Sequence, residues 1–421
     1  YTINGTLRYE GSNMLGKSRQ ARWLPTWNVS GSWNAHEENW WAPTFGKAWT
    51  YASLKGSYSL TADRGPASNS LAVFTSFTPW RPSTSANESA IILAALENSE
   101  LTYEKKHELN IGVALGFVDN RINVEFDWYR RNNFDLIGYT QTMGVGGVTT
   151  KLANDATMES TGCEFTISTT NIKTKDFKWT TDWIFGWAEN TITKLDSRSQ
   201  VYSLVNGVGR TEGRPIGALY SIPFAGLTEE GLPTFYIDAE HTQVVGPGNY
   251  ADIYFQEYEN IDYLKYEGTI DPKITGSFGN TFSWKGLKLN VFFTYSFGNV
   301  LRLDNLCPVY SSDYSDLTAS MKEMKNRWMV PGDENVTTIP SIPTVRQMRE
   351  IDALSNAYSA YNYSTERVAK GDFIRLKELS LAYDLPKKYF EGQNAVSSFG
   401  VKLSATNLWL AYADKKLNGR D

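Results

Sequence analysis

The chain has 421 residues with 41 Lys and Arg, 46 Asp and Glu, and a formal net charge of −5. This balance gives no electrostatic basis for binding nucleic acid. Mean hydropathy is −0.39, and the longest aliphatic run, Ala90 to Leu96, is far shorter than the roughly 20 apolar residues of a membrane-spanning helix. A helical membrane protein is therefore excluded. A transmembrane β-barrel is not, because its lumen-facing polar residues cancel the lipid-facing apolar ones in any average.

Period-two hydrophobicity recurs along the chain and predicts strands of about ten residues or more. In the clearest example Ile122, Val124, Phe126 and Trp128 alternate with Asn123, Glu125 and Asp127. Similar faces run from Trp179 to Trp187 and from Leu287 to Tyr295. In chain order, we predict strands at 1–9, 23–34, 48–59, 103–117, 121–135, 157–169, 177–190, 270–283, 287–298, 371–384 and 400–412.

The connections between these strands sort into two sets that alternate along the chain. The compact set is 38–47, 118–120, 171–176, 284–286 and 385–399, and the long polar set includes 60–102, 136–156, 191–269 and 299–370. Asp119-Asn120 and Lys285-Gly286 are turn sequences that tolerate positive φ. The strict alternation predicts an antiparallel up-and-down meander, with the compact turns on the periplasmic side of an outer membrane and the long loops outside.

Two further expectations concern helices and completeness. The best helix candidates lie inside the long loops, at 88–96 and 316–328. About eleven strands is an odd number, whereas single-chain bacterial barrels have an even number, and an open sheet would leave unpaired edges in lipid. We therefore expect strands to be missing from this chain, at least before its first residue.

A series of motifs resembles the SusC/RagA family of TonB-dependent outer-membrane transporters of the Bacteroidota. Leu7 to Ser12 (LRYEGS) is similar to the opening of a family barrel strand, and Glu108 to Gly112 (ELNIG) to another strand. Gly213 to Gly217 (GRPIG) and Asn326-Arg327-Trp328 with Pro331-Gly332-Asp333 match loop motifs. The most specific match is Gly371 to Lys377 (GDFIRLK), followed by Leu381 to Pro386 (LAYDLP). The motifs keep the family order along nearly the whole chain.

This resemblance implies that residues 1–421 are the C-terminal half of a 22-stranded barrel, with the earlier strands and the final strand outside this chain. The barrel would be closed by an N-terminal plug, with a TonB-contacting segment before it. It also implies a SusD-like surface lipoprotein as partner, and import of glycan oligomers or peptides. TonB would act through the N-terminal part, which this chain does not contain.

Catalysis and metal binding receive little support from the sequence. His36, His107 and His241 are scattered, and Cys163 and Cys307 have no metal-type spacing. Glu229-Glu230 and Asp238 with Glu240 are carboxylates in a polar loop, where solvated charge is their commoner role. We predict no enzyme activity and no cofactor.

Four tyrosines in the long loops are the candidate contacts for a substrate or partner. Tyr310, Tyr314, Tyr361 and Tyr363 could stack on sugar faces or pack against another protein, and internal loop packing is the alternative for each. Trp40 and Trp41 lie in a compact connection and favour anchoring at the membrane interface instead.

Two other functions remain open at this stage. One is a soluble all-β glycan-binding or glycosidase module, in which the apolar strand faces would be buried between sheets. The other is a non-transporting barrel that serves as a scaffold in an outer-membrane complex.

Overall fold

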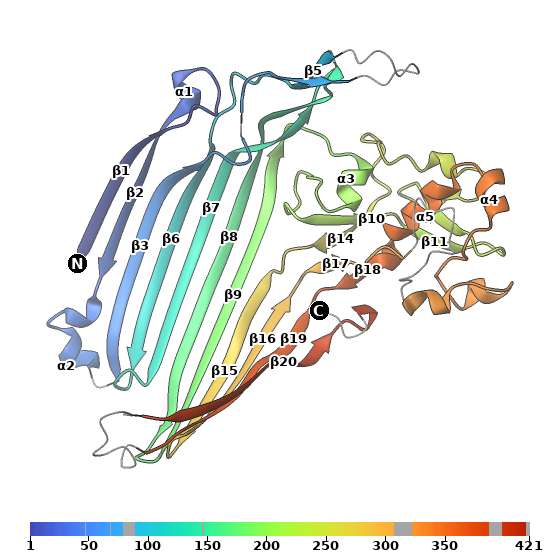
Figure 1. Ribbon diagram of the computed structural model, residues 1–421. Coiled ribbons are helices and arrows are strands. Elements are labelled where there is room, and N and C mark those ends of the chain that lie inside the picture. The colour runs from blue at the N-terminus through green and yellow to red at the C-terminus, as the bar shows by residue number, and fades with distance from the viewer. Residues whose placement is uncertain are drawn as a thin grey trace.

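Eleven antiparallel strands form a single broad sheet (Figure 1). The computed structural model describes residues 1–46, 48–67, 69–78, 89–144, 147–306, 322–386 and 398–417. Each strand pairs with the strands before and after it in the meander, so the predicted up-and-down partial barrel is confirmed. In order the strands are β1 (Thr2–Gly11), β2 (Trp23–Trp33), β3 (Trp49–Asp63), β6 (Glu104–Phe117), β7 (Ile122–Gln141), β8 (Thr150–Lys173), β9 (Phe177–Leu195), β15 (Ile274–Trp284), β16 (Leu287–Phe297), β19 (Phe373–Asp384) and β20 (Gly400–Ala413).

One face of the sheet carries a continuous row of apolar side chains. Directly paired residues share a face, and Phe126 pairs with Phe165, which pairs with Phe185. The predicted apolar faces of three separate strands therefore lie on one side of the sheet. From β2 to β20 the paired row is Trp33, Leu54, Val113, Phe126, Phe165, Phe185, Gly276, Tyr295, Ile374 and Tyr412.

None of the residues in this row is buried, and three of them are exposed. Leu54, Phe126 and Tyr412 keep 44%, 39% and 49% of their surface accessible. In a soluble sandwich these side chains would be covered by a second sheet about 10 Å away. The part of the chain that the structure describes places no such sheet over them, which contradicts the sandwich alternative.

The opposite face of the sheet is polar beside this apolar row. Glu125 pairs with Thr166, and Asp127 pairs with Glu164. Ser168 Oγ donates a hydrogen bond of 2.7 Å to Asp182 Oδ1 across β8 and β9. The alternation predicted from single strands is thus maintained across the sheet.

The connections separate to the two ends of the sheet as predicted (Figure 1). The compact end includes η1 (Ala35–Glu37) and α2 (Trp41–Phe45) between β2 and β3. Its turns use the expected left-handed residues, because Asp119 and Asn120 have φ of 54° and 58°, and Lys285 has φ of 45°. The left-handed region favours Gly, Asn and Asp, so these turn residues fix the hairpins locally.

The other end of the sheet carries all the long connections. Near β1 to β8 they contain α1 (Arg19–Arg22), β4 (Val73–Phe77) and β5 (Ala90–Ala95), and η9 (Lys415–Leu417) follows β20. The remaining elements are α3 (Val201–Val205), β10 (Ala218–Ser221), β11 (Phe224–Leu227), β12 (Pro233–Tyr236), β13 (Val244–Val245), η3 (Tyr250–Asp252), β14 (Lys265–Thr269), β17 (Val300–Arg302), η5 (Lys322–Asn326), η6 (Asp333–Asn335), α4 (Val345–Glu350), α5 (Leu354–Asn362), η7 (Thr365–Arg367) and β18 (Val368–Lys370). Among the described residues, none of the helices has the length and apolar character needed to span a membrane.

One local prediction was wrong, and a second can be compared only over part of its range. The helix predicted at 88–96 is a strand instead, since Ala90–Ala95 forms β5, which pairs with β4; residue 88 lies outside the described residues. The β-branched Ile91 and Ile92 favour a strand once a partner strand is available. Within 316–328, only Lys322–Asn326 is a short 3₁₀ helix, and 316–321 lie outside the described residues.

The connection predicted at 136–156 is much shorter than expected. Strand β7 continues to Gln141 and β8 begins at Thr150, so these two strands extend well beyond the apolar face. Their register shifts near Leu136. This irregularity breaks the period-two pattern and hides the extension from the sequence.

Candidate functional site

The long connections after β9 and β16 fold together into a unit with its own core. We call residues 196–273, 298–306 and 322–372 the loop domain (Figure 1). Its core holds the fully buried side chains of Phe235, Tyr250 and Tyr361, with 0%, 1% and 1% exposure. Tyr250 Oη donates to the carbonyl of Pro233 at 2.7 Å. The long loops therefore form a folded platform at the loop-side end of the sheet.

Arg302 joins three segments of the loop domain. Its Nη1 donates to the carbonyl of Ser364 at 3.0 Å, and its Nη2 donates to the carbonyl of Val205 at 3.1 Å and to that of Tyr220. Burial lowers the pKa of the Arg302 guanidinium to about 10. The buried guanidinium has lost most of its contact with water, and the three carbonyl oxygens provide hydrogen-bond acceptors in place of that water.

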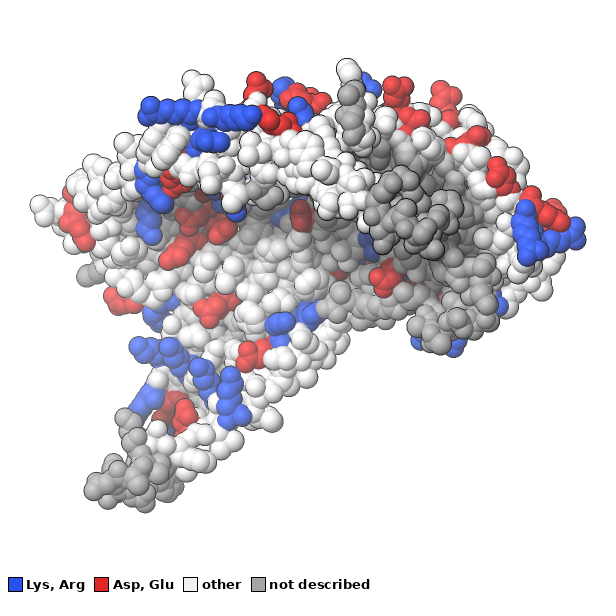
Figure 2. Space-filling view, turned by 45° about the horizontal axis from the view of Figure 1, so that its top comes forward, with Lys and Arg blue, Asp and Glu red and all other residues white. Residues whose placement is uncertain are grey.

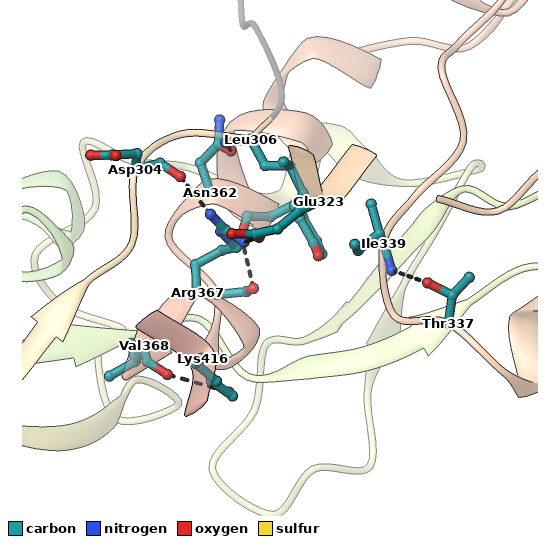
Figure 3. Close-up of polar contacts among 11 residues, drawn as sticks. Asp304, Leu306, Glu323, Thr337, Ile339, Asn362, Arg367, Val368 and Lys416 are labelled. Atoms are coloured by element: carbon teal, nitrogen blue, oxygen red, sulfur yellow. Dashed lines mark hydrogen bonds and ion pairs between the residues drawn. The ribbon is translucent and has the colours of Figure 1, made fainter. Parts of the chain in front are cut away.

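Arg367 forms a second clasp, shown in Figure 3. Its Nη1 donates to Glu323 Oε2 and its Nη2 to the carbonyl of Asp304, both at 2.6 Å. Asn362 adds a contact close by, because its Oδ1 accepts from the amide of Leu306 at 3.0 Å. Asp304 and Glu323 flank residues 307–321, so one guanidinium holds both flanks of that segment.

Of the four predicted tyrosines, the structure describes Tyr361 and Tyr363. Tyr361 is 1% exposed and packs its ring 5.7 Å from that of Phe224, as the alternative of internal loop packing expects. Tyr363 is half-buried, and its ring lies 5.9 Å from the Arg302 guanidinium. Tyr310 and Tyr314 lie outside the described residues. Contact between these tyrosines and a substrate or partner stays a prediction.

A cavity that the sequence did not predict lies where the loop domain meets β7 and β8. Its volume is about 460 Å³, and its lining includes residues 137–139 and Gln141 of β7, Asp155 of β8, and residues 197–200 and 208–210 of the loop domain. Tyr139 stands at its edge with 73% of its surface exposed. We call this feature the rim cavity. Its size is within the range of small-molecule sites.

The floor of the rim cavity is polar and buried. Asp155 is 2% exposed, and its Oδ2 accepts from Ser197 Oγ at 2.8 Å. Arg210 is fixed by two contacts, since its amide donates to Ser199 Oγ at 2.8 Å and its Nη2 to the carbonyl of Ile137 at 3.4 Å. Asp155 Oδ1 and Arg210 Nη1 are buried with no hydrogen-bond partner in the described structure.

Sequence reasoning missed this site because its residues come from three distant segments. Asp155 lies in an irregular stretch of β8, and Arg210 lies in a Gly-rich loop with no recognisable motif. The one sequence feature that could have indicated a site here is the polar sequence on both sides of the β7–β8 turn.

Charges on the loop-side surface are mixed. Figure 2 shows Lys and Arg beside Asp and Glu around the rim and within the hollow of the sheet, without a large field of one sign on the visible face. Among the described residues, no group of three or more His, Cys, Asp or Glu is arranged to hold a metal ion. The three histidines make separate contacts; His107, for example, stacks on Tyr58 with ring centres 5.6 Å apart.

Over nearly its whole length, the chain is similar to proteins named TonB-dependent receptors. No family model matches the chain. "TonB-dependent receptor P3" of Formosa agariphila is 26% identical over 431 residues, which covers 98% of this chain and 40% of that protein. "TonB-dependent receptor SusC" of Bacteroides thetaiotaomicron is 34% identical over 99 residues, which covers 23% of this chain and 10% of SusC. A structure of the RagAB peptide transporter superposes with a TM-score of 0.72 at 22% identity, covering 97% of this chain and 42% of that chain.

The predicted SusC/RagA-type resemblance is confirmed. The chain spans about two fifths of the length of the curated relatives that it matches over nearly its whole length. The eleven-stranded sheet is the part of the chain that resembles the barrels of these proteins, and the loop domain and the rim cavity lie at one end of it.

Proposed function

We propose that this chain is the barrel part of an outer-membrane, TonB-dependent importer of glycan oligomers or peptides. The complete barrel would have 22 strands around an N-terminal plug. A SusD-like surface lipoprotein would cover the loop-side end, and TonB would act through the N-terminal part of the whole protein. The barrel itself would have no enzyme activity.

The observation that carries this proposal is the apolar row across ten strands, which no described part of the chain buries, with the long connections at one end of the sheet. An exposed band of this kind suits contact with acyl chains, and the polar opposite face suits a solvated lumen. The relatives supply the remaining support, since they are named TonB-dependent receptors and the similar solved structure is a peptide transporter.

The test uses the full-length protein, expressed in the outer membrane of a Gram-negative host together with the lipoprotein encoded by the adjacent gene. Cells are supplied with fluorescent oligosaccharides and, separately, with fluorescent oligopeptides. Uptake of one class that stops when TonB is deleted would support the proposal.

Two results would contradict it. Recovery of the protein in the soluble fraction would contradict its assignment as a membrane barrel. A correctly inserted barrel that takes up neither class of substrate would favour the scaffold alternative. Co-purification of the lipoprotein in detergent tests the partner separately.

A further inference from the structure

Two glycines form the bottom of a groove on the apolar face of the sheet, away from the loop domain (Figure 1). Gly31 of β2 pairs with Gly56 of β3, next to the Trp33–Leu54 pair of the apolar row. Alternate residues of a strand share a face, so both glycines lie on the face that meets lipid. The volume of the groove is about 500 Å³, and its lining includes Ile3, Gly31, Trp33, Leu54, Gly56 and Ile111. We call it the glycine groove.

The groove exists because these two positions carry no side chain. A Cβ built on Gly56 has no heavy atom of its surroundings within 4 Å, and one built on Gly31 has only the carbonyl oxygen of Thr2, at 3.8 Å. The next pair towards the loop side is Val29 with Tyr58, and these residues are 55% and 44% exposed. Large side chains therefore border the hollow on its compact side and on its loop side.

We propose that the glycine groove binds one acyl chain of an amine-bearing phospholipid of the periplasmic leaflet, with the ammonium headgroup beside Glu38. Ile3, Leu54, Ile111 and the indole of Trp33 give the groove apolar walls. A hydrocarbon chain gains both burial and close contact there, which a polar ligand does not. The groove opens on the face that contacts acyl chains, so a lipid reaches it without leaving the bilayer.

A carboxylate stands at the compact end of the glycine groove. Trp33 is the last residue of β2, and its Nε1 donates to Glu38 Oε1 at 3.0 Å. Hydrogen bonds from Trp33 and Tyr1 lower the pKa of Glu38, which keeps this carboxylate charged at neutral pH. An ammonium group is attracted to the carboxylate, whereas the net negative charge of an anionic lipid is repelled by it. The groove therefore selects the chain, and Glu38 selects the headgroup.

The wall that Trp33 forms is held in place by its neighbours. Trp33 packs against the buried cluster of Ala35, Trp41 and Ala52. A preformed wall lowers the cost of ordering side chains when a ligand binds. A strand added beside β1 would extend the sheet at its edge and would leave this face open. The groove thus remains accessible to lipid in a larger barrel.

This inference rests on the proposed function, because it needs the apolar face to lie in an outer membrane with the compact end at the periplasmic leaflet. It goes beyond that function, since the phospholipid is neither an imported substrate nor a protein partner. Lipid binding and uptake are measured separately, so each can fail without the other.

The experiment uses native mass spectrometry of the full-length protein in a mild detergent. Dioleoyl phosphatidylethanolamine and dioleoyl phosphatidylglycerol are titrated separately, and the Kd of each is measured. Gly56→Leu fills the groove. Gly5→Leu is its matched control, because Gly5 pairs with Val29 on the same face and has nothing within 4 Å of its built Cβ, but does not line the groove.

A second pair of variants tests the headgroup. Glu38→Gln removes the carboxylate beside Trp33, and Glu37→Gln is the control because Glu37 is its exposed neighbour in the same connection. Barrel folding of every variant is checked by its heat-dependent shift on a denaturing gel. If Gly56→Leu does not show this shift, Gly31→Leu takes its place.

We expect the wild type to bind phosphatidylethanolamine about threefold or more tightly than phosphatidylglycerol. Gly56→Leu should weaken phosphatidylethanolamine binding about tenfold or more, since it displaces methylene groups from the groove, and Gly5→Leu should leave the Kd unchanged. Glu38→Gln should remove the preference between the two lipids, and Glu37→Gln should keep it.

Equal Kd values for the wild type and the groove variant, or tighter binding of phosphatidylglycerol by the wild type, would overturn the inference. A dimer that the groove variant separates into monomers would assign the groove to a second copy of the chain, which would also overturn it. TonB-dependent uptake without specific lipid binding would leave the proposed function intact. Specific lipid binding by an inserted barrel that takes up no substrate would count against the proposed function alone.

Discussion

Arg367 and Glu323 form an ion pair of 2.6 Å whose guanidinium is only 4% exposed, while the carboxylate keeps 22%. The same guanidinium also donates to the carbonyl of Asp304. Arg367 therefore holds two separate segments of the loop domain, one at Asp304 and the other at Glu323. Most other ion pairs of the described structure are far more exposed.

Arg367→Ala should therefore destabilise the loop domain by about 3–5 kcal/mol, since it leaves a partly buried carboxylate without its cation. The measurement is the rate of limited proteolysis within the loop domain of the detergent-purified protein. Arg346→Ala is the matched control, because the Arg346–Glu350 pair is 82% and 60% exposed. The control should change stability by no more than about 0.5 kcal/mol, and equal effects of the two variants would show that the Arg367 clasp has no special role.

Phe126→Arg tests which face meets lipid. Phe126 lies in the apolar row, whereas its neighbour Glu125 lies on the polar face. We expect a loss of about 2–4 kcal/mol for Phe126→Arg in a bilayer and a small effect for Glu125→Arg. Folding titrations in lipid vesicles measure both, and equal tolerance at the two positions would reverse or remove the face assignment.

The adjacent tryptophans Trp40 and Trp41 should differ sharply. Trp41 is 6% exposed, and its Nε1 donates to the carbonyl of Trp49 at 2.9 Å, whereas Trp40 is 48% exposed. Trp41→Ala should cost about 3–5 kcal/mol through lost packing, and Trp40→Ala less than about 1 kcal/mol in detergent. Thermal unfolding in detergent distinguishes them. Only Trp40 is exposed enough to anchor the compact end at the membrane interface, so a larger loss for Trp40 would refute this division.

Tyr263 should ionise late and stabilise the loop domain up to high pH. Burial, with a smaller contribution from Glu257, raises the pKa of Tyr263 to about 12. Its pKa in an unfolded chain is about 10. The stabilisation is therefore complete below pH 10 and is lost as the pH rises from 10 through 12. The difference in absorbance at 295 nm between the wild type and Tyr263→Phe should titrate near pH 12, and a midpoint near pH 10 would contradict the burial of this hydroxyl.

The sheet could be predicted closely from the sequence because each of its strands repeats the same physical pattern. Phe126, Phe185 and Tyr295 belong to three separately recognised faces, and the register places them in one row. The turns were also predictable, since Asp119, Asn120 and Lys285 adopt the positive φ that their turns require. These features depend on neighbours along the chain, which sequence patterns report directly.

The loop domain and the rim cavity could not be predicted in this way. The clasp of Arg302 joins Val205, Tyr220 and Ser364, which no local pattern relates. The rim cavity combines residues of β7 and β8 that lie beyond a register shift with residues 197–200 and 208–210 of the loop domain. The sequence motifs indicated the type of barrel. The position of the rim cavity depends instead on the packing of loops that are distant in the sequence.

The length of β8 has a consequence for where the protein meets its surroundings. Its 24 residues, at about 3.3 Å each and a tilt of about 45°, climb about 56 Å along the membrane normal. The hydrophobic belt of an outer-membrane barrel is only about 25 Å tall. The hairpin of β7 and β8 would therefore project beyond the lipid headgroups. An antibody, a phage or a polymer outside an intact cell could contact Tyr139 there before anything enters the pore.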